Sequence, residues 1–493
     1  MTDNPLYYRP AHQLMADLRT GALSSVEVTR AFLERISERN GQVNAVVHLN
    51  EEAALSAAQA ADEALKSGAT PGPLHGLPLT IKDTWEVTEM TCTAGAPALK
   101  QHRPKQSADV VEKLVAAGAI VVGKTNVPLY ASDIQSYNKL FGVTNNPYDN
   151  AHTPGGSSGG AAAALAAGMT PLEVGSDLAG SIRTPAHFCG VFGHKPSRGL
   201  VSFRGHIPGP PGTMGQPDLA EGGPLSRSAK DLELLLNVIA GPTGADSRCW
   251  QLALEPSQLT DLRQARVGLW LDDPHCPISK ELSQGYGEFA EQLSQAGAEV
   301  IQARHPLLSL ERIMPVYFNL LGSLLSTSFK PGQRRQLLWI SRLDKVLRRF
   351  VPLTAGVGQY GQGVNQGIHQ WIQWHETREK MRAQIETLFE HHDVLLTPVT
   401  PTTAIPHDLS QPIFKRKVMV NGKPRSYLDQ FCWIALATLL GLPATSVPVG
   451  RTAKGLPYNI QVIGAPGKDL TTIRFAQLLE EQGLAGFRVP EGY

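Results

Sequence analysis

Residues 152–198 read H-T-P-G-G-S-S-G-G-A-A-A-A-L-A-A-G-M-T-P-L-E-V-G-S-D-L-A-G-S-I-R-T-P-A-H-F-C-G-V-F-G-H-K-P-S-R. Two clusters of glycine and serine, residues 155–160 and 175–181, enclose a small-residue segment. The alanine-rich residues 161–167 favour a helix, and Gly168 favours its end. Because glycine lets a backbone approach other groups closely, the clusters are expected to place serines and free N–H groups at the ends of one short buried helix. Such an arrangement can supply a nucleophile together with a pocket that stabilises an anion.

This stretch resembles the signature of the amidase signature family of serine hydrolases, which reads G-G-S-S-G-G, a small-residue helix, and then G-S-D-x-G-G-S-I-R-x-P-A. The family's triad is Ser–Ser–Lys, with a cis peptide bond before the middle serine. Matched position by position, the resemblance implies that Ser181 is the nucleophile and Ser157 the bridging serine. Ala179 stands where the family usually has glycine, but alanine keeps the backbone N–H. The alternative interpretation is a Gly/Ser-rich linker, which would not carry Asp177 and Arg183 among apolar and small residues.

Upstream of this stretch, residues 79–84 read L-T-I-K-D-T, which predicts a strand that ends in charged residues. Lys82 follows an apolar run, so its ammonium group is expected to enter the interior, where it costs desolvation energy unless it is neutral or well paired. A lone lysine at a strand end more often points back to solvent. The family, however, carries its catalytic lysine in this kind of apolar K-D segment upstream of the G-G-S-S-G-G cluster. The resemblance therefore implies that Lys82 is the base of the triad.

Further residues are expected to support the triad. Backbone N–H groups before and at the nucleophile are expected to form the oxyanion hole. A charged pair is expected to brace the nucleophile loop, and a second serine to support the bridging serine. The resemblance also implies two positions that line the acyl pocket. These residues are Leu178, Ala179, Gly180 and Ser181 for the oxyanion hole, Asp177 and Arg183 for the brace, Ser158 for the support, and Ala131 and Ser132 for substrate binding.

Strands and helices alternate along the chain without a clear linker, which predicts one α/β domain over residues 1–493. The resemblance covers nearly the whole chain and implies a central mixed β-sheet covered by helices on both faces. The mostly helical residues 300–390 are expected to shape the substrate pocket. The Pro/Gly-rich loop 203–223 is expected to rim that pocket, because loops of this length are usually functional. The basic residues 345–349 are interpreted as a solvated helix face.

The composition excludes several classes of protein. Of the 493 residues, 42% are hydrophobic and 18% charged, which is ordinary for a globular protein with a large core. A net charge of +1 favours neither nucleic acid nor a membrane surface as a partner. No run of about 18 apolar residues predicts a membrane span, and the N-terminal sequence lacks a signal-peptide pattern. The five scattered cysteines lack C-x-x-C, so we expect reduced thiols in a cytoplasmic monomer or homodimer.

The expected function is hydrolysis of the carbon–nitrogen bond of a small, fairly apolar amide. A Ser181 acyl-enzyme would form with the help of Ser157 and Lys82, without a metal or organic cofactor. One alternative is the glutamine-hydrolysing subunit of a tRNA-dependent amidotransferase, although Q-W-I-Q-W-H-E-T-R at 370–378 departs from the tyrosine-rich segment of that type. The same triad could hydrolyse esters, carbamates or oligoamides. A nucleotide-binding protein is a remote alternative, because residues 118–125 satisfy G-x-x-x-x-G-K-T, although their A-I-V-V favours a buried strand over a phosphate-binding loop.

Overall fold

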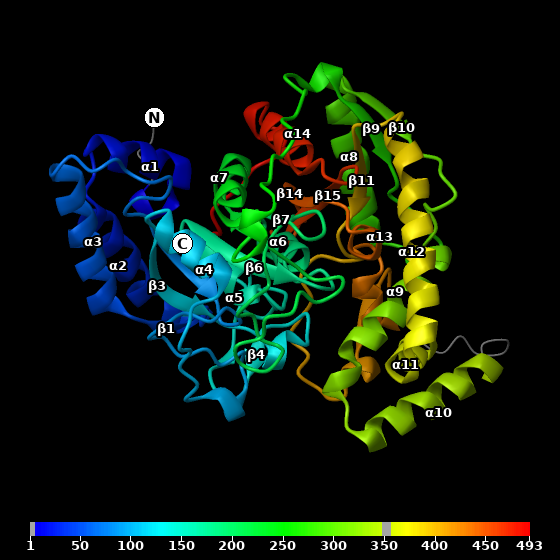
Figure 1. Ribbon diagram of the computed structural model, residues 1–493. Coiled ribbons are helices and arrows are strands. Elements are labelled where there is room, and N and C mark those ends of the chain that lie inside the picture. The colour runs from blue at the N-terminus through cyan, green and yellow to red at the C-terminus, as the bar shows by residue number, and fades with distance from the viewer. Residues whose placement is uncertain (1–4, 348–355) are drawn as a thin grey trace.

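The computed structural model describes residues 5–347 and 356–493. An 11-stranded mixed β-sheet runs through the centre of the molecule (Figure 1). In order across the sheet, its strands are β1 (Val46–Leu49), β3 (Ile120–Thr125), β2 (Pro78–Lys82), β6 (Leu172–Asp177), β8 (Glu221–Ser226), β7 (Phe192–Lys195), β14 (Ala444–Arg451), β15 (Pro457–Ile463), β11 (Val394–Pro398), β9 (Arg266–Leu269) and β10 (Glu299–Gln302). Two short ribbons lie outside this sheet, β4 (Tyr137–Asn138) with β5 (Gly142–Val143), and β12 (Lys417–Val420) with β13 (Lys423–Ser426). The predicted α/β class is confirmed.

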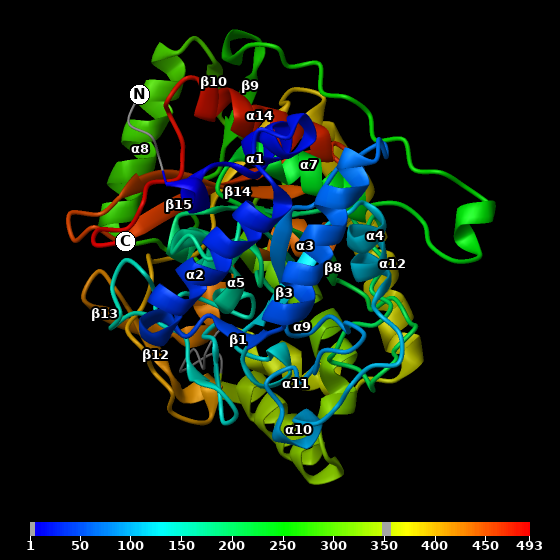
Figure 2. The ribbon, with the colours of Figure 1, turned by 90° about the vertical axis from the view of Figure 1, so that its left-hand side faces the viewer.

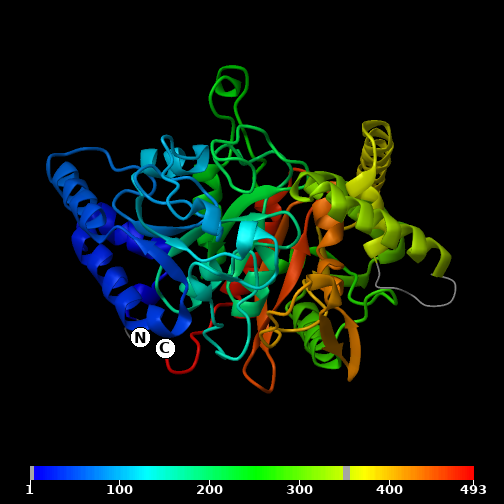
Figure 3. The same cartoon turned by 90° about the horizontal axis from the view of Figure 1, so that it is seen from below.

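Helices pack along the whole length of the sheet. They are α1 (Ala11–Thr20), α2 (Ser25–Val43), α3 (Glu51–Lys66), α4 (Asp109–Ala116), α5 (Gly159–Ala166), α6 (Arg183–Cys189), α7 (Ala229–Ile239), α8 (Lys280–Gln295), α9 (Leu310–Leu325), α10 (Pro331–Leu347), α11 (Val357–Asn365), α12 (Ile368–Phe389), α13 (Ala435–Leu440) and α14 (Asp469–Glu481). Helices α2 and α3 lie beside the β1–β3 end (Figure 2), and α9 to α12 lie at the opposite side of the molecule (Figure 3). The basic run 345–349 lies outside the residues whose side chains are described.

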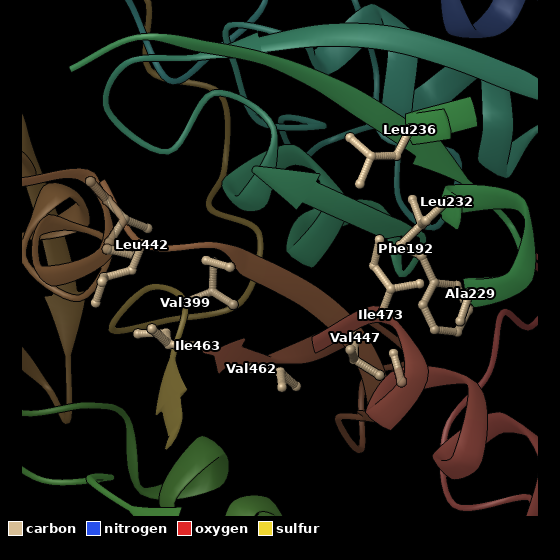
Figure 4. Packing of buried hydrophobic residues seen from close by; sticks show 14 of the residues in the cluster. Phe192, Ala229, Leu232, Leu236, Val399, Leu442, Val447, Val462, Ile463 and Ile473 are labelled. Atoms are coloured by element: carbon tan, nitrogen blue, oxygen red, sulfur yellow. The ribbon is translucent and has the colours of Figure 1, made fainter. Parts of the chain in front are cut away.

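Helices cover both faces of the middle of the sheet. On one face, Phe192 of β7 packs with Leu232 of α7 and Ile473 of α14 (Figure 4). The next residue, Gly193, faces α6, because a Cβ there would lie 2.9 Å from the side chain of Ala186. Since successive strand residues point to opposite faces, α7 with α14 and α6 form two separate layers. The middle strands are therefore shielded from water on both sides.

Strands β2 and β6 place the candidate site within this shielded region. They run parallel, with Thr80 opposite Glu173, and every residue of both strands is buried. Such strands read as continuous buried runs without alternation of polar and apolar residues. Because parallel strands end at the same edge of a sheet, Lys82 at the end of β2 comes close to Ser176 near the end of β6.

The position of the second glycine–serine cluster, residues 175–181, differs from the expectation. The sequence predicts it at the end of the small-residue helix, which the structure shows as α5. Instead, Gly175–Asp177 belong to β6, because residues 172–177 pair with β2 on one side and β8 on the other. Ser181 follows this strand and precedes α6. The two clusters still meet, since the Ser158 N–H donates a hydrogen bond to the Ser181 carbonyl at 3.1 Å.

Two further observations bear on the composition-based expectations. Among residues 5–347 and 356–493, no helix is both long and apolar enough to cross a membrane. The five cysteines are free thiols, of which Cys249 is exposed and the other four are buried. The thiols are therefore far from forming a disulfide framework.

Candidate active site

Lys82 ends β2 with its amine enclosed by hydroxyl and carbonyl groups. Its Nζ lies 2.7 Å from Ser157 Oγ, 2.9 Å from Ser176 Oγ and 3.3 Å from the Ser176 carbonyl oxygen. The side chain is fully buried, and this burial lowers the pKa of Lys82 to about 7, against the opposing effect of Asp177 and Glu173. The prediction that Lys82 turns into the interior is confirmed. Such an amine is partly neutral at neutral pH and can accept a proton.

The neighbouring carboxyl groups do little to keep Lys82 charged. Asp83, the next residue, turns away to Lys124, whose Nζ lies 3.0 Å from Asp83 Oδ1, and it also accepts hydrogen bonds from Thr93. Burial raises the pKa of the Glu173 carboxyl to about 8, so this group is mostly protonated at neutral pH. The local charge balance therefore favours a neutral Lys82.

Lys124 also bears on the nucleotide-binding alternative, because it belongs to the G-x-x-x-x-G-K-T pattern at 118–125. Residues Ile120–Thr125 form β3 inside the sheet. The Lys124 amine donates a hydrogen bond to the Trp85 carbonyl at 2.7 Å in addition to its pairing with Asp83. A phosphate-binding loop needs free N–H groups and a free lysine. The arrangement of these residues contradicts that alternative.

Ser157 lies just before α5, where the backbone is tightly packed. The Gly156–Ser157 peptide bond is cis, as the resemblance implies. Glycine is required at 156, because a Cβ there would lie 2.7 Å from the Asp133 carbonyl oxygen and 2.8 Å from the Gln135 nitrogen. Among the described residues, Lys82 is the one hydrogen-bond partner of Ser157 Oγ. The Ser157 hydroxyl therefore faces the amine.

Ser181 occupies the outer end of the same group of residues. It keeps 8% of its surface exposed, whereas Ser157 keeps 1% and Lys82 none. Within the described parts of the chain, Ser181 Oγ makes no hydrogen bond, either to Ser157 or to any other group. Catalytic hydrogen bonds are often long until substrate binds. Ser158, which links the two clusters through its N–H, also directs its hydroxyl to the Ser176 carbonyl at 3.5 Å.

A buried ion pair holds the loop that carries Ser181. Arg183 donates two hydrogen bonds to Asp177, from Nε to Oδ2 at 3.0 Å and from Nη2 to Oδ1 at 2.9 Å. The carboxylate also accepts hydrogen bonds from the backbone N–H groups of Gly180, Ile182 and Arg183. Burial opposes ionisation of this carboxyl, but Arg183 outweighs it and lowers the pKa of Asp177 to about 2. The contacts match the bracing role predicted for this pair.

Arg183 connects this loop to the C-terminal part of the chain. Its Nη1 donates to the Ile434 carbonyl at 3.0 Å and to Gln461 Oε1 at 2.7 Å. Its Nη2 also donates to Thr438 Oγ1 at 2.7 Å. The guanidinium is therefore fully engaged although it is completely buried.

We expect replacement of Arg183 by methionine to destabilise the protein by about 3–5 kcal/mol, because it leaves the Asp177 carboxylate buried without its partner. The matched control is Arg198→Met, which breaks a partly exposed pair with Glu379 and should cost at most about 1 kcal/mol. Urea unfolding of the parent and both variants measures the two losses. A loss at Arg183 no larger than that at Arg198 would show that the pair does not hold the loop.

The backbone N–H groups of this loop differ in their availability. Those of Leu178, Ala179 and Ser181 donate no hydrogen bond within the described parts of the chain. The Gly180 N–H instead donates to Asp177 Oδ1 at 2.8 Å. Gly180 has a φ of 89°, a left-handed conformation that favours glycine. Of the three residues predicted for the oxyanion hole, two therefore offer a free N–H, and Ser181 offers another.

Ala131 and Ser132, predicted to contact substrate, lie in a surface segment. Ala131 is half-buried with a φ of 54°, and Ser132 is exposed with its hydroxyl donating to the Leu129 carbonyl at 2.6 Å. The next residue, Asp133, is buried and its carbonyl packs against Gly156. The pair thus begins the segment that packs against the bridging serine, and its contact with substrate stays a prediction.

Two polar residues near Lys82 are not singled out by the sequence. Ser176 contacts the amine directly, and His206 Nε2 lies 2.9 Å from Ser176 Oγ. His206 belongs to the loop 203–223 and is 3% exposed, whereas residues 208–216 of that loop are mostly exposed. No local pattern places His206 beside Ser176, because this contact joins a loop to a strand 30 residues earlier.

Comparison with known proteins is consistent along almost the whole chain. A family model described as Amidase matches residues 27–473. A subunit of the glutamyl-tRNA(Gln) amidotransferase of Chloroflexus aggregans is 32% identical over 485 residues, which cover 95% of each chain.

Two solved structures resemble the molecule as a whole. One described as an amidase gives a TM-score of 0.75 at 28% identity and covers 96% of this chain and 100% of the other. Another is described as an unexpected vestigial protein complex that reveals the evolutionary origins of an s-triazine catabolic enzyme. It gives a TM-score of 0.78 at 27% identity and covers 97% of this chain and 100% of the other.

Proposed function

Because this chain belongs to the amidase family and is an amide-hydrolysing enzyme, we propose that it acts through an acyl-enzyme on Ser181, with Ser157 and Lys82 moving the proton. The observation that carries this proposal is the 2.7 Å contact between Lys82 Nζ and Ser157 Oγ. It lies in a buried site where the amine has lost much of its affinity for a proton. A serine hydroxyl needs such a base, since it is a weak nucleophile by itself.

Acylation begins when Ser181 Oγ attacks the carbonyl carbon of the amide. The Ser181 proton passes to Ser157 as the Ser157 proton passes to Lys82, which becomes an ammonium. The carbonyl oxygen becomes an oxyanion that the free N–H groups of Leu178 and Ala179 stabilise. The Gly180 N–H can join them only after it leaves Asp177.

The tetrahedral intermediate then collapses, and the carbon–nitrogen bond breaks. The proton returns from Lys82 through Ser157 to the leaving nitrogen, which departs as an amine or ammonia. A water molecule loses its proton along the same route and attacks the acyl ester. Its attack releases the carboxylic acid and restores Ser181. These steps use the Ser–Lys variant of triad chemistry.

Two kinds of substrate are candidates for this chemistry. We propose a small, fairly apolar amide, because residues 370–378 lack the tyrosine-rich character of the glutamine-hydrolysing type. The name of the Chloroflexus aggregans relative favours glutamine instead, as the ammonia source of an amidotransferase. An ester, carbamate or oligoamide would react through the same acyl-enzyme.

The substrate proposal predicts that the purified chain alone hydrolyses small aryl or alkyl amides with a kcat/KM at least about tenfold above that for glutamine, because a pocket of matching apolar size binds their transition states better. Amides of graded acyl length are compared with glutamine by product release. The Ser181→Ala variant supplies the blank for each substrate. A higher kcat/KM for glutamine than for every other amide would support the amidotransferase alternative and contradict this proposal.

Assembly and location follow from the choice of substrate. An enzyme of free small amides needs no partner chain, so we propose a cytoplasmic monomer or homodimer that contacts neither nucleic acid nor membrane. A glutamine-hydrolysing subunit would instead deliver ammonia to another protein. Activity of the isolated chain therefore supports the first candidate.

A further inference from the structure

The hydrogens around Lys82 impose a condition on the hydroxyl of Ser176. A neutral lysine amine has two hydrogens and one lone pair. To take a proton from Ser157, the lone pair must point at Ser157 Oγ, 2.7 Å away. The two hydrogens are then left for the Ser176 carbonyl at 3.3 Å and Ser176 Oγ at 2.9 Å. Ser176 Oγ must therefore accept a hydrogen bond from Lys82, and its own hydrogen must point elsewhere.

The same orientation is needed after proton transfer. The Lys82 ammonium then has three hydrogens, and the same three oxygens surround it. If the Ser176 hydroxyl turned its hydrogen toward the amine, it would occupy the lone pair in the neutral state. It would also repel one N–H in the charged state. Ser176 thus serves both states of the base only as an acceptor.

His206 is the group that can take the Ser176 hydrogen. Among the described residues, Ser176 Oγ has two side-chain partners, Lys82 Nζ and His206 Nε2, the latter at 2.9 Å. An acceptor at Nε2 requires the imidazole to be neutral with its hydrogen on Nδ1. Burial, with the charges of Lys82 and Lys124, lowers the pKa of His206 well below its usual value, which keeps the ring neutral.

The surroundings of His206 hold the ring in this place. Its ring packs edge-on against Trp85, at 4.5 Å between ring centres, and in a tilted arrangement against Phe203, at 4.4 Å. The backbone is held as well, because the Ile207 N–H donates to the Thr84 carbonyl at 2.8 Å. Nδ1 is buried and has no hydrogen-bond partner among residues 5–347 and 356–493. The polar contact of the imidazole is therefore directed at Ser176 through Nε2.

We propose that His206 is a positioning residue that keeps the Ser176 hydroxyl as an acceptor for Lys82 and so keeps the Lys82 lone pair directed at Ser157. The proposal rests on the function proposed above. His206 touches neither substrate nor Ser181, and it acts through Ser176 alone. Its removal should therefore slow proton transfer and leave substrate binding unchanged.

The test compares two amide side chains at this position. A glutamine side chain would carry its terminal oxygen about as far from the backbone as Nε2 of the histidine, whereas the terminal group of asparagine is one carbon shorter. We expect His206→Gln to keep kcat within about threefold of the parent and His206→Asn to lower it about tenfold, with KM unchanged in both, because a single hydrogen bond is lost. Unfolding midpoints of the two variants show whether both are folded.

A second comparison removes Ser176 itself. In a Ser176→Ala background, His206→Asn should cause no further loss of kcat, since the histidine then has no hydroxyl to orient. An equal loss in both backgrounds, or equal activity of the glutamine and asparagine variants, would overturn the proposal. Either result leaves the acyl-enzyme mechanism standing if Ser181→Ala is inactive, so the two failures are distinguishable.

Discussion

Ser181→Ala should leave a folded protein that hydrolyses amides slower by on the order of a thousandfold or more, because the covalent route is lost. The fold should survive, since Ser181 Oγ makes no hydrogen bond within the described residues and its backbone carbonyl still accepts from Ser158. Initial rates on one activated anilide measure the loss. Mass measurement after rapid quenching should show the acyl adduct on the parent and none on the variant.

The matched control for this prediction is Ser158→Ala. It removes a neighbouring hydroxyl whose hydrogen bond to the Ser176 carbonyl is long, at 3.5 Å. Its effect should be small beside that of Ser181→Ala. If Ser181→Ala kept activity within about tenfold of the parent, Ser181 would be rejected as the nucleophile, and the acyl adduct would have to be sought elsewhere.

The pH dependence of the parent should show the titration of Lys82. Burial lowers the pKa of this lysine to about 7, so the amine is charged and inactive as a base below that pH and neutral above it. The kcat/KM should therefore rise from acid pH, reach half its plateau near the pKa, and level off at mildly alkaline pH. A profile on the same anilide measures this rise.

Replacement of Lys82 separates the role of a base from that of a structural cation. Lys82→Arg should be nearly as damaging as Lys82→Ala, because guanidinium stays protonated. Both should lower kcat/KM by about a thousandfold, with a residual rate from the oxyanion hole. If Lys82→Arg kept most of the activity, or if the parent profile were flat across neutral pH, the base would lie elsewhere.

Sequence reasoning was strongest where a residue's position depends on local pattern. The apolar run before Lys82 predicted an inward lysine, and the amine is fully buried. The small-residue segment predicted the helix that the structure shows as α5. Asp177 and Arg183 were predicted as a brace, and they form a two-fold hydrogen-bonded pair.

It was weakest where strands pair across the sheet. Residues 172–177 are buried on both faces, so they show no alternation that would mark β6 as a strand. The contact of Ser176 with Lys82 depends on the pairing of β6 with β2, and its contact with His206 depends on the path of a long loop. The use of the Gly180 N–H by Asp177 follows from the loop conformation alone. None of these features is written in local residue spacing.

The contacts of Arg183 have a consequence for the order in which the enzyme is synthesised. Its partners Ile434 and Gln461 follow it by 251 and 278 residues. A chain emerging from the ribosome therefore carries Ser181 long before the groups that complete the surroundings of Arg183 have been translated. Until β15 is made, the nucleophile loop lacks its final support. Hydrolysis is expected to begin only when translation is nearly finished, so truncated products of an interrupted message would accumulate as inactive protein.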